Sequence, residues 1–121
     1  MKRIRLLSLP DPRIDRADPQ YDAAVVDYRT LVEAALRVPL DRQNGATIAE
    51  MRKSMRVLDA LDCSENGILE LEDADWQVLK DKVEKMPWAM VDRRILEFCD
   101  DVMEATDAPK AELAAASNSH A

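Results

Sequence analysis

Histidine, cysteine and glycine are scarce in this 121-residue chain, and each scarcity narrows the chemistry open to it. His120 is the only histidine and lies at the end of the sequence, which excludes a histidine-based catalytic triad or a histidine-ligated zinc site in the core. Cys63 and Cys99 are too far apart in the sequence to indicate a metal site, and we expect two reduced thiols, with a disulfide between them left open. The sequence therefore predicts a protein that is not an enzyme and carries no cofactor.

Long apolar runs and an excess of positive charge are also missing. No segment approaches the ~20 apolar residues of a membrane span, and the stretch LLSL that follows the basic residues MKRIR is too short for a signal peptide. The net charge is −7 and the pI is near 4.7, whereas binding to nucleic acid or anionic membrane needs clustered Lys and Arg. We expect protein partners, no membrane, no direct contact with nucleic acid, and a cytoplasmic location.

What the sequence does contain favours helices. Hydrophobic residues make up 47% and charged residues 34%, with only two glycines and six methionines. We predict a mainly α fold, a compact bundle of about four helices with a short N-terminal strand or extended arm and a flexible C-terminal tail. The arm spans residues 1–19, where residues 2–9 read as a strand and three prolines follow. The helical domain spans residues 20–105, and the tail spans residues 106–121.

Apolar residues at spacings of three and four place helices at residues 21–37, 48–61, 73–86 and 88–105. Thr47 and Glu50 form a predicted capping box at the start of the second helix. The expected buried stripes contain Ile48, Met51, Met55, Leu58 and Leu61 in the second helix, Trp76, Leu79, Val83 and Met86 in the third, and Val91, Ile95, Phe98 and Val102 in the fourth. We expect Trp76, Leu79, Ile95 and Phe98 to be buried together.

The methionines can have either of two roles. Met51, Met55, Met86, Met90 and Met103 either fill the core or line an adaptable binding groove, because the thioether side chain packs against varied partners. Core filling is the favoured interpretation.

One stretch, DCSENGILELED at residues 62–73, resembles a calcium loop. Its residues at positions 1, 3, 5, 6, 8 and 12 of the EF-hand pattern are Asp62, Ser64, Asn66, Gly67, Leu69 and Asp73. Against this interpretation, Trp76 and Leu79 are out of phase with the apolar positions of an exiting EF-hand helix. We favour a structural turn, with Leu69 and Leu71 facing inward and Glu70 outward, and we assign no metal ligands.

The stretches GATIAEMRKSMRVLDALD and LELEDADWQVLKDKVEKMPW resemble small proteins of tailed bacteriophages and prophages that are encoded among structural and assembly genes. The resemblance implies a virion component or a tail or head assembly factor, such as a tail assembly chaperone, with no catalytic residues to carry over. Its partners would be other virion subunits or further copies of the chain, in the cytoplasm of the bacterial host or in a virion. Two alternatives are an acidic inhibitor that mimics nucleic acid on a host enzyme and a single-site calcium-binding protein.

Overall fold

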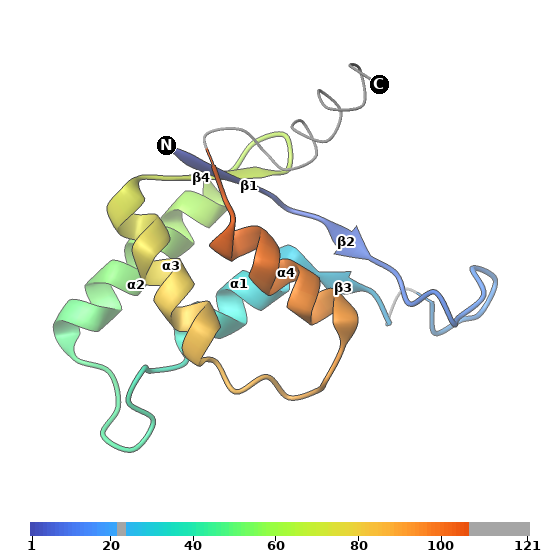
Figure 1. Ribbon diagram of the computed structural model, residues 1–121, viewed down its shortest axis with the longest axis horizontal. Helices are drawn as coiled ribbons and strands as arrows, with labels where there is room; N and C mark the ends of the chain where they lie inside the picture. The colour runs from blue at the N-terminus through green and yellow to red at the C-terminus, as the bar shows by residue number, and fades with distance from the viewer. Residues whose placement is uncertain (22–23, 107–121) are drawn as a thin grey trace.

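The computed structural model describes residues 1–21 and 24–106, which form four helices and four short strands (Figure 1). In chain order these elements are β1 (Lys2–Arg5), β2 (Ser8–Leu9), β3 (Val26–Asp27), α1 (Tyr28–Arg37), α2 (Ile48–Asp62), β4 (Ile68–Leu71), α3 (Asp73–Lys85) and α4 (Arg93–Met103). The four predicted helices are confirmed. The pure bundle is not, because the strands form two antiparallel pairs, β1 with β4 and β2 with β3, and the fold is mixed α/β.

The strand β1 belongs to the folded core. Ile4 lies opposite Leu69 in the antiparallel pair and is only 2% exposed. On the outer side, Arg3 lies opposite Glu70, and their side chains form an exposed ion pair at 3.5 Å. The predicted N-terminal strand is therefore present, and a sheet of two strands fixes it to the helices where we expected an arm outside the helical domain.

Two helices agree with their predicted boundaries and two begin later. The helices α2 and α3 start and end within about a residue of the prediction. In contrast, α1 begins at Tyr28, because Val26 and Asp27 pair with β2 and the Asp27 carboxylate accepts a hydrogen bond from the Arg29 amide. Likewise α4 begins at Arg93, with Asp92 as its N-cap. The predicted helical state of Tyr21, of residues 24–27 and of residues 88–92 was wrong.

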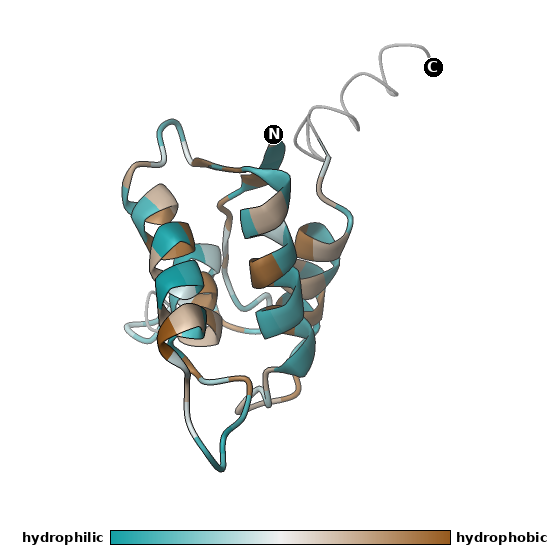
Figure 2. Ribbon diagram, turned by 90° about the vertical axis from the view of Figure 1, so that its left-hand side faces the viewer, coloured by the Kyte–Doolittle hydropathy of each residue, from teal (hydrophilic) through white to brown (hydrophobic). Residues whose placement is uncertain are grey.

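Each helix carries hydrophilic and hydrophobic residues on different sides (Figure 2). The buried side chains come from β1, β4 and all four helices. At the centre, the Tyr28 and Phe98 rings meet edge to face with centroids 5.1 Å apart, and both side chains are 0% exposed. The Tyr28 hydroxyl donates a hydrogen bond to Asp101 at 2.6 Å, and burial raises the pKa of Tyr28. The tyrosine thus fills the core as a neutral phenol.

The predicted burial of Leu79, Ile95 and Phe98 is confirmed. Trp76 is only half-buried, since its ring lies at the edge of the core between the ammonium groups of Lys2 and Lys80. Its indole nitrogen donates a hydrogen bond to the Val102 carbonyl at 2.8 Å. Trp76 therefore connects α3 to the end of α4.

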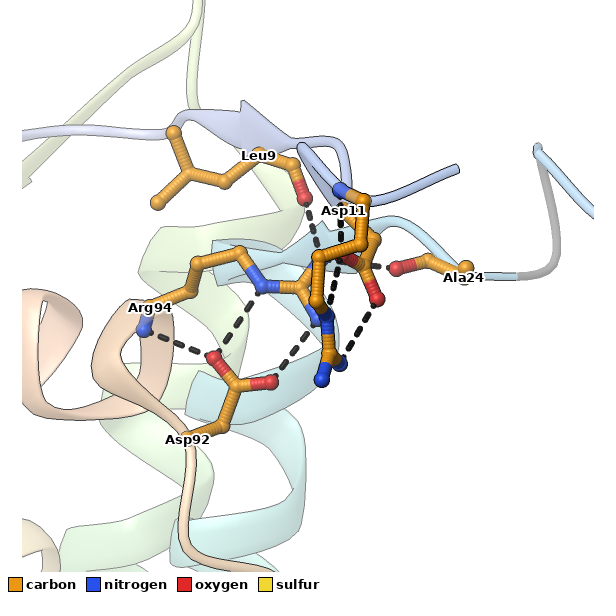
Figure 3. A network of polar contacts seen from close by, with 6 residues as sticks. Leu9, Asp11, Ala24, Asp92 and Arg94 are labelled. Atoms are coloured by element: carbon orange, nitrogen blue, oxygen red, sulfur yellow. Dashed lines mark hydrogen bonds and ion pairs between the residues drawn. The ribbon is translucent and has the colours of Figure 1, made fainter. Parts of the chain in front are cut away.

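A single arginine joins the start of α4 to the two segments that carry β2 and β3 (Figure 3). The Arg94 guanidinium donates to the carbonyls of Leu9 and Ala24, at 3.0 and 2.8 Å, and to both carboxylate oxygens of Asp92. Next to it, hydrogen bonds from the Arg13 side chain hold the pKa of Asp11 at about 2. The contact with Leu9 fixes the end of β2 to the start of α4, and Asp11 is buried, although the sequence placed residues 1–19 in an extended arm.

The predicted tail at residues 106–121 lies outside the described residues except for Thr106, whose carbonyl accepts a hydrogen bond from the Arg3 amide at 2.8 Å. Within residues 1–21 and 24–106, no helix is both long and apolar enough to cross a membrane.

We predict that Ile4→Ala lowers the free energy of unfolding by about 2–5 kcal/mol, the usual cost of truncating a buried isoleucine. Arg5→Ala, one residue away on the exposed side of β1, should change it by less than about 0.5 kcal/mol. Urea denaturation followed by circular dichroism measures both. Equal, small effects would show that β1 is dispensable for the core.

Candidate functional site

The loop between α2 and β4 has the backbone of a tight turn. Asn66 and Gly67 have φ angles of 57° and 69°, the pair of positive values that a type I′ turn requires. The Ile68 amide donates to the Glu65 carbonyl at 3.1 Å, which closes the turn. Beyond it, Leu69 and Leu71 are buried and Glu70 is exposed, as predicted. Asn66 and Gly67 thus serve to reverse the chain into β4.

The Ser64 hydroxyl of this loop already has hydrogen-bond partners in the fold. The Ser64 hydroxyl donates to the Leu61 carbonyl at 2.7 Å and accepts a hydrogen bond from the Arg29 guanidinium at 2.7 Å. A second nitrogen of Arg29 donates to the same carbonyl at 3.1 Å. Arg29 therefore places a positive charge at the third position of the calcium pattern, where a bound calcium ion would need a free oxygen.

The acidic ends of the pattern lie in helices, with Asp62 as the last residue of α2 and Asp73 as the first residue of α3. Over the part of the chain that the structure describes, no three or more His, Cys, Asp or Glu side chains gather where they could hold a metal ion.

The helix α2 carries exposed apolar residues that the sequence analysis placed in the core. Leu58 and Leu61 are buried as predicted, but Ile48, Met51 and Met55 are 69%, 53% and 50% exposed, so their predicted burial was wrong. The helix turns Val57, Leu58 and Leu61 toward its neighbours α1 and α3, and the other three lie on a different face near its N-terminus. We call Ile48, Met51 and Met55 the α2 patch.

A groove of about 260 Å³ runs beside the α2 patch. Its apolar lining comes from the end of α1, the following loop and α2: Leu36, Pro39, Ala46, Met51, Met55 and Leu58. Polar groups from Arg37, Glu50, Ser54 and Lys82 also line it. Ser54 is only 6% exposed, and its hydroxyl has no hydrogen-bond partner within the described chain. A buried hydroxyl without a partner costs free energy in the folded state.

A buried ion pair forms the polar end of this groove. The Lys82 ammonium donates to the Glu50 carboxylate and to the Val38 carbonyl, the latter at 2.8 Å, and the lysine side chain is 3% exposed. Glu50 also accepts from the Leu40 amide at 3.0 Å. The capping box is therefore only half formed: Thr47 accepts from the Glu50 amide, while the glutamate side chain bonds to Lys82 and Leu40.

A second group of exposed apolar residues lies at the start of α4. Met90, Val91 and Leu96 are 58%, 108% and 60% exposed, and we call them the α4 patch. Val91 was expected on a buried stripe, but it precedes the helix. Trp88, Ile95 and Cys99 join these three residues around a shallow depression of about 500 Å³. Burial raises the pKa of the Cys99 thiol, so this cysteine is a neutral apolar group.

The five methionines divide between the two interpretations. Met51 and Met55 line the groove at α2, Met90 lines the depression at α4, and Met86 and Met103 are half-buried. No pattern in the sequence separates the exposed three from the others, because all five recur at helical spacing. Lys82 was also missed, since a lysine among the charged residues 80–85 gives no sign that it is buried.

We predict that Gly67→Ala destabilises the protein by about 1–2 kcal/mol, because a side chain is strained at a φ of +69°. Glu65→Ala, in the same turn, is the control, with a change below about 0.5 kcal/mol.

Millimolar calcium should leave the melting temperature unchanged relative to the same concentration of magnesium. A rise that is specific to calcium and disappears in Asp62→Ala would instead establish the EF-hand interpretation.

A further prediction concerns pH. Hydrogen bonds from Lys82 and then Leu40 hold the pKa of Glu50 below its ordinary value of 4.5. This carboxylate therefore stabilises the fold above about pH 4.5, and its contribution is lost as the pH falls through the lower pKa of the folded state.

Glu50→Gln should lower stability at pH 7 by about 3–5 kcal/mol, because it leaves a buried lysine charge unpaired. In denaturation curves between pH 7 and 3, the difference in free energy of unfolding between Glu50→Gln and wild type should become smaller below about pH 4.5. Glu70→Gln, in the exposed pair with Arg3, should cost less than about 1 kcal/mol. A difference in free energy of unfolding between Glu50→Gln and wild type that does not change with pH would contradict the stabilising role assigned to the Glu50–Lys82 ion pair.

Comparison with known proteins gives no assignment, since no protein-family model matches the chain and no solved structure matches it significantly.

Proposed function

We propose that this chain is a non-enzymatic protein that acts by binding other proteins, as a virion component or a tail or head assembly factor of a tailed bacteriophage. It would act in the cytoplasm of the bacterial host or within the virion. One observation carries the protein-binding part: of the seven large apolar residues that are at least half exposed in the described chain, six lie in two groups, the α2 patch and the α4 patch. The phage part rests on the sequence resemblance alone.

Exposed apolar side chains that lie together in a patch favour a binding surface. Burying one large aliphatic side chain or methionine contributes about 1.5–3 kcal/mol, so each patch forgoes several kcal/mol in water that a partner could recover. The groove beside the α2 patch strengthens the argument, because Met51 and Met55 can adapt to the shape of an incoming group.

The alternative of an acidic inhibitor requires a surface of closely spaced carboxylates. The described surface mixes the two signs on the exposed side of α2, where Arg52, Lys53 and Arg56 accompany Asp59. The two functions also differ in salt response, since a charge mimic loses affinity steeply as ionic strength rises and an apolar contact does not.

Gene position and co-purification together test the proposal. We expect the gene to lie among capsid and tail genes, and the chain to co-purify with the product of a neighbouring gene when the two are co-expressed. Binding should persist from 0.1 to about 1 M salt, where the Debye length falls to roughly 3 Å.

The matched variants each introduce one glutamate. Met51→Glu should abolish co-purification, whereas Gln20→Glu, on an exposed residue outside both patches, should not. A locus among early genes, or a complex that dissolves in moderate salt, would favour the inhibitor instead.

A further inference from the structure

The two patches belong to parts of the chain that a third helix separates. The helix α3 packs against both α2 and α4 and stands between them (Figure 1). Neither patch covers the other within the described chain, and the groove at α2 and the depression at α4 share no lining residue. Each copy therefore presents two separate apolar surfaces.

The α4 patch contains one side chain that is open enough to enter the groove. The α2 patch adjoins the groove, and the α4 patch surrounds its own shallow depression, at whose rim Val91 is 108% exposed on the segment between α3 and α4. Residues 88–91 of that segment are not helical and make no hydrogen bond through their backbone to another described residue. An inserted 88–91 segment could thus supply an apolar side chain to the groove.

Charge distinguishes the two patches as well. Arg37 and Arg52 are exposed beside the α2 patch and form no ion pair with a described residue, and the one carboxylate near Met55 on the same face is Asp59. The pairing of Glu50 with Lys82 removes the remaining charges from the groove. The exposed loop residues Asp41 and Arg42, next to the Leu40 amide that bonds to Glu50, add one charge of each sign. The surroundings of the α2 patch are therefore slightly basic in a chain whose net charge is −7.

The surroundings of the α4 patch have the opposite sign. Glu97 and Asp100 lie one and four residues after Leu96 on the exposed side of α4, against one unpaired basic residue, Arg93. Asp92 and Arg94 neutralise each other. Pairing two α2 patches would oppose arginines, and pairing two α4 patches would oppose carboxylates, whereas pairing one with the other brings opposite charges together.

We propose that the α2 patch of one copy binds the α4 patch of the next copy, so that the chain associates head to tail with itself. The proposal identifies a partner for the proposed protein-binding function and rests on it. Because the two surfaces in the contact are different, the interface is heterologous, and repeated contacts produce a ring if the rotation closes or a filament if it does not. A second copy of this chain is thus the occupant of the groove.

Sedimentation velocity of two variants and their mixture tests this arrangement. Met55→Glu disables the groove and Val91→Glu disables the 88–91 segment, and both sites are exposed enough to leave the fold intact, as circular dichroism and the melting temperature will verify. Wild type should form larger species with increasing concentration. Each variant alone should be monomeric, with its dissociation constant raised at least about tenfold. An equimolar mixture should form a dimer and nothing larger, because one working groove then meets one working segment.

Gln20→Glu adds the same charge outside both patches and should associate as wild type does. A single variant that keeps the wild-type assembly would show a symmetric contact through one patch and overturn the proposal, as would a mixture that stays monomeric. A wild-type chain that is monomeric up to about 1 mM would also overturn it. That last result would not affect the proposed function, which co-purification with a different protein tests separately.

Discussion

The antiparallel pair of β1 and β4 is the contact on which the rest of the structure depends. It places Ile4 beside Leu69, and both side chains are buried between the helices. The same strand contacts α3, where the Lys2 ammonium lies 4.8 Å from the centre of the Trp76 ring, and the end of the described chain, where the Arg3 amide bonds to Thr106. Four residues at the N-terminus thus connect the middle of the sequence with its far end.

This pairing has a consequence for folding. The helices α2 and α3 are neighbours in sequence and can pack early, but their connecting strand β4 has an unpaired edge until the N-terminus arrives from more than 60 residues away. Contacts of such separation close slowly, because the chain entropy of the loop is lost before the contact contributes. The free edge of β4 also needs β1 as protection, since an exposed edge strand pairs with other chains.

Local signals in the sequence predicted local structure well. Thr47 begins α2, Asn66 and Gly67 reverse the chain, and the alternation of Leu69, Glu70 and Leu71 gives the strand its buried side. The predictions were wrong where a segment with helical spacing of apolar residues pairs with a strand instead. Residues 26–27 were predicted as helix, but they pair with β2. A period of three or four residues does not show which segments will pair as strands.

The candidate surfaces appeared in the sequence only as the less favoured interpretation of the methionines, for a related reason. Periodicity places Ile48, Met51, Met55, Leu58 and Leu61 on one stripe of α2, but only the packing of its neighbours decides how much of that stripe is covered. The helices α1 and α3 bury the side of Val57 and Leu61 and leave Met51 and Met55 in water. Lys82 is the converse case, because a charged residue is buried where the Glu50 carboxylate and the Val38 carbonyl accept hydrogen bonds from its ammonium group.

The net charge of −7 and the apolar patches act over different distances. Copies of an acidic chain repel one another, but at physiological salt the repulsion between exposed charges fades beyond about 8 Å. Apolar contact stabilises a complex only when the two surfaces touch. Copies that meet in a random orientation are therefore repelled. In the proposed contact, only copies that meet with the α2 patch against the α4 patch gain enough free energy to stay together. In the proposed head-to-tail contact, Arg37 and Arg52 facing Glu97 and Asp100 locally reverse that repulsion, which orients the incoming copy before Val91 reaches the groove. Charge would then select the orientation of the contact, and the apolar side chains would supply its strength.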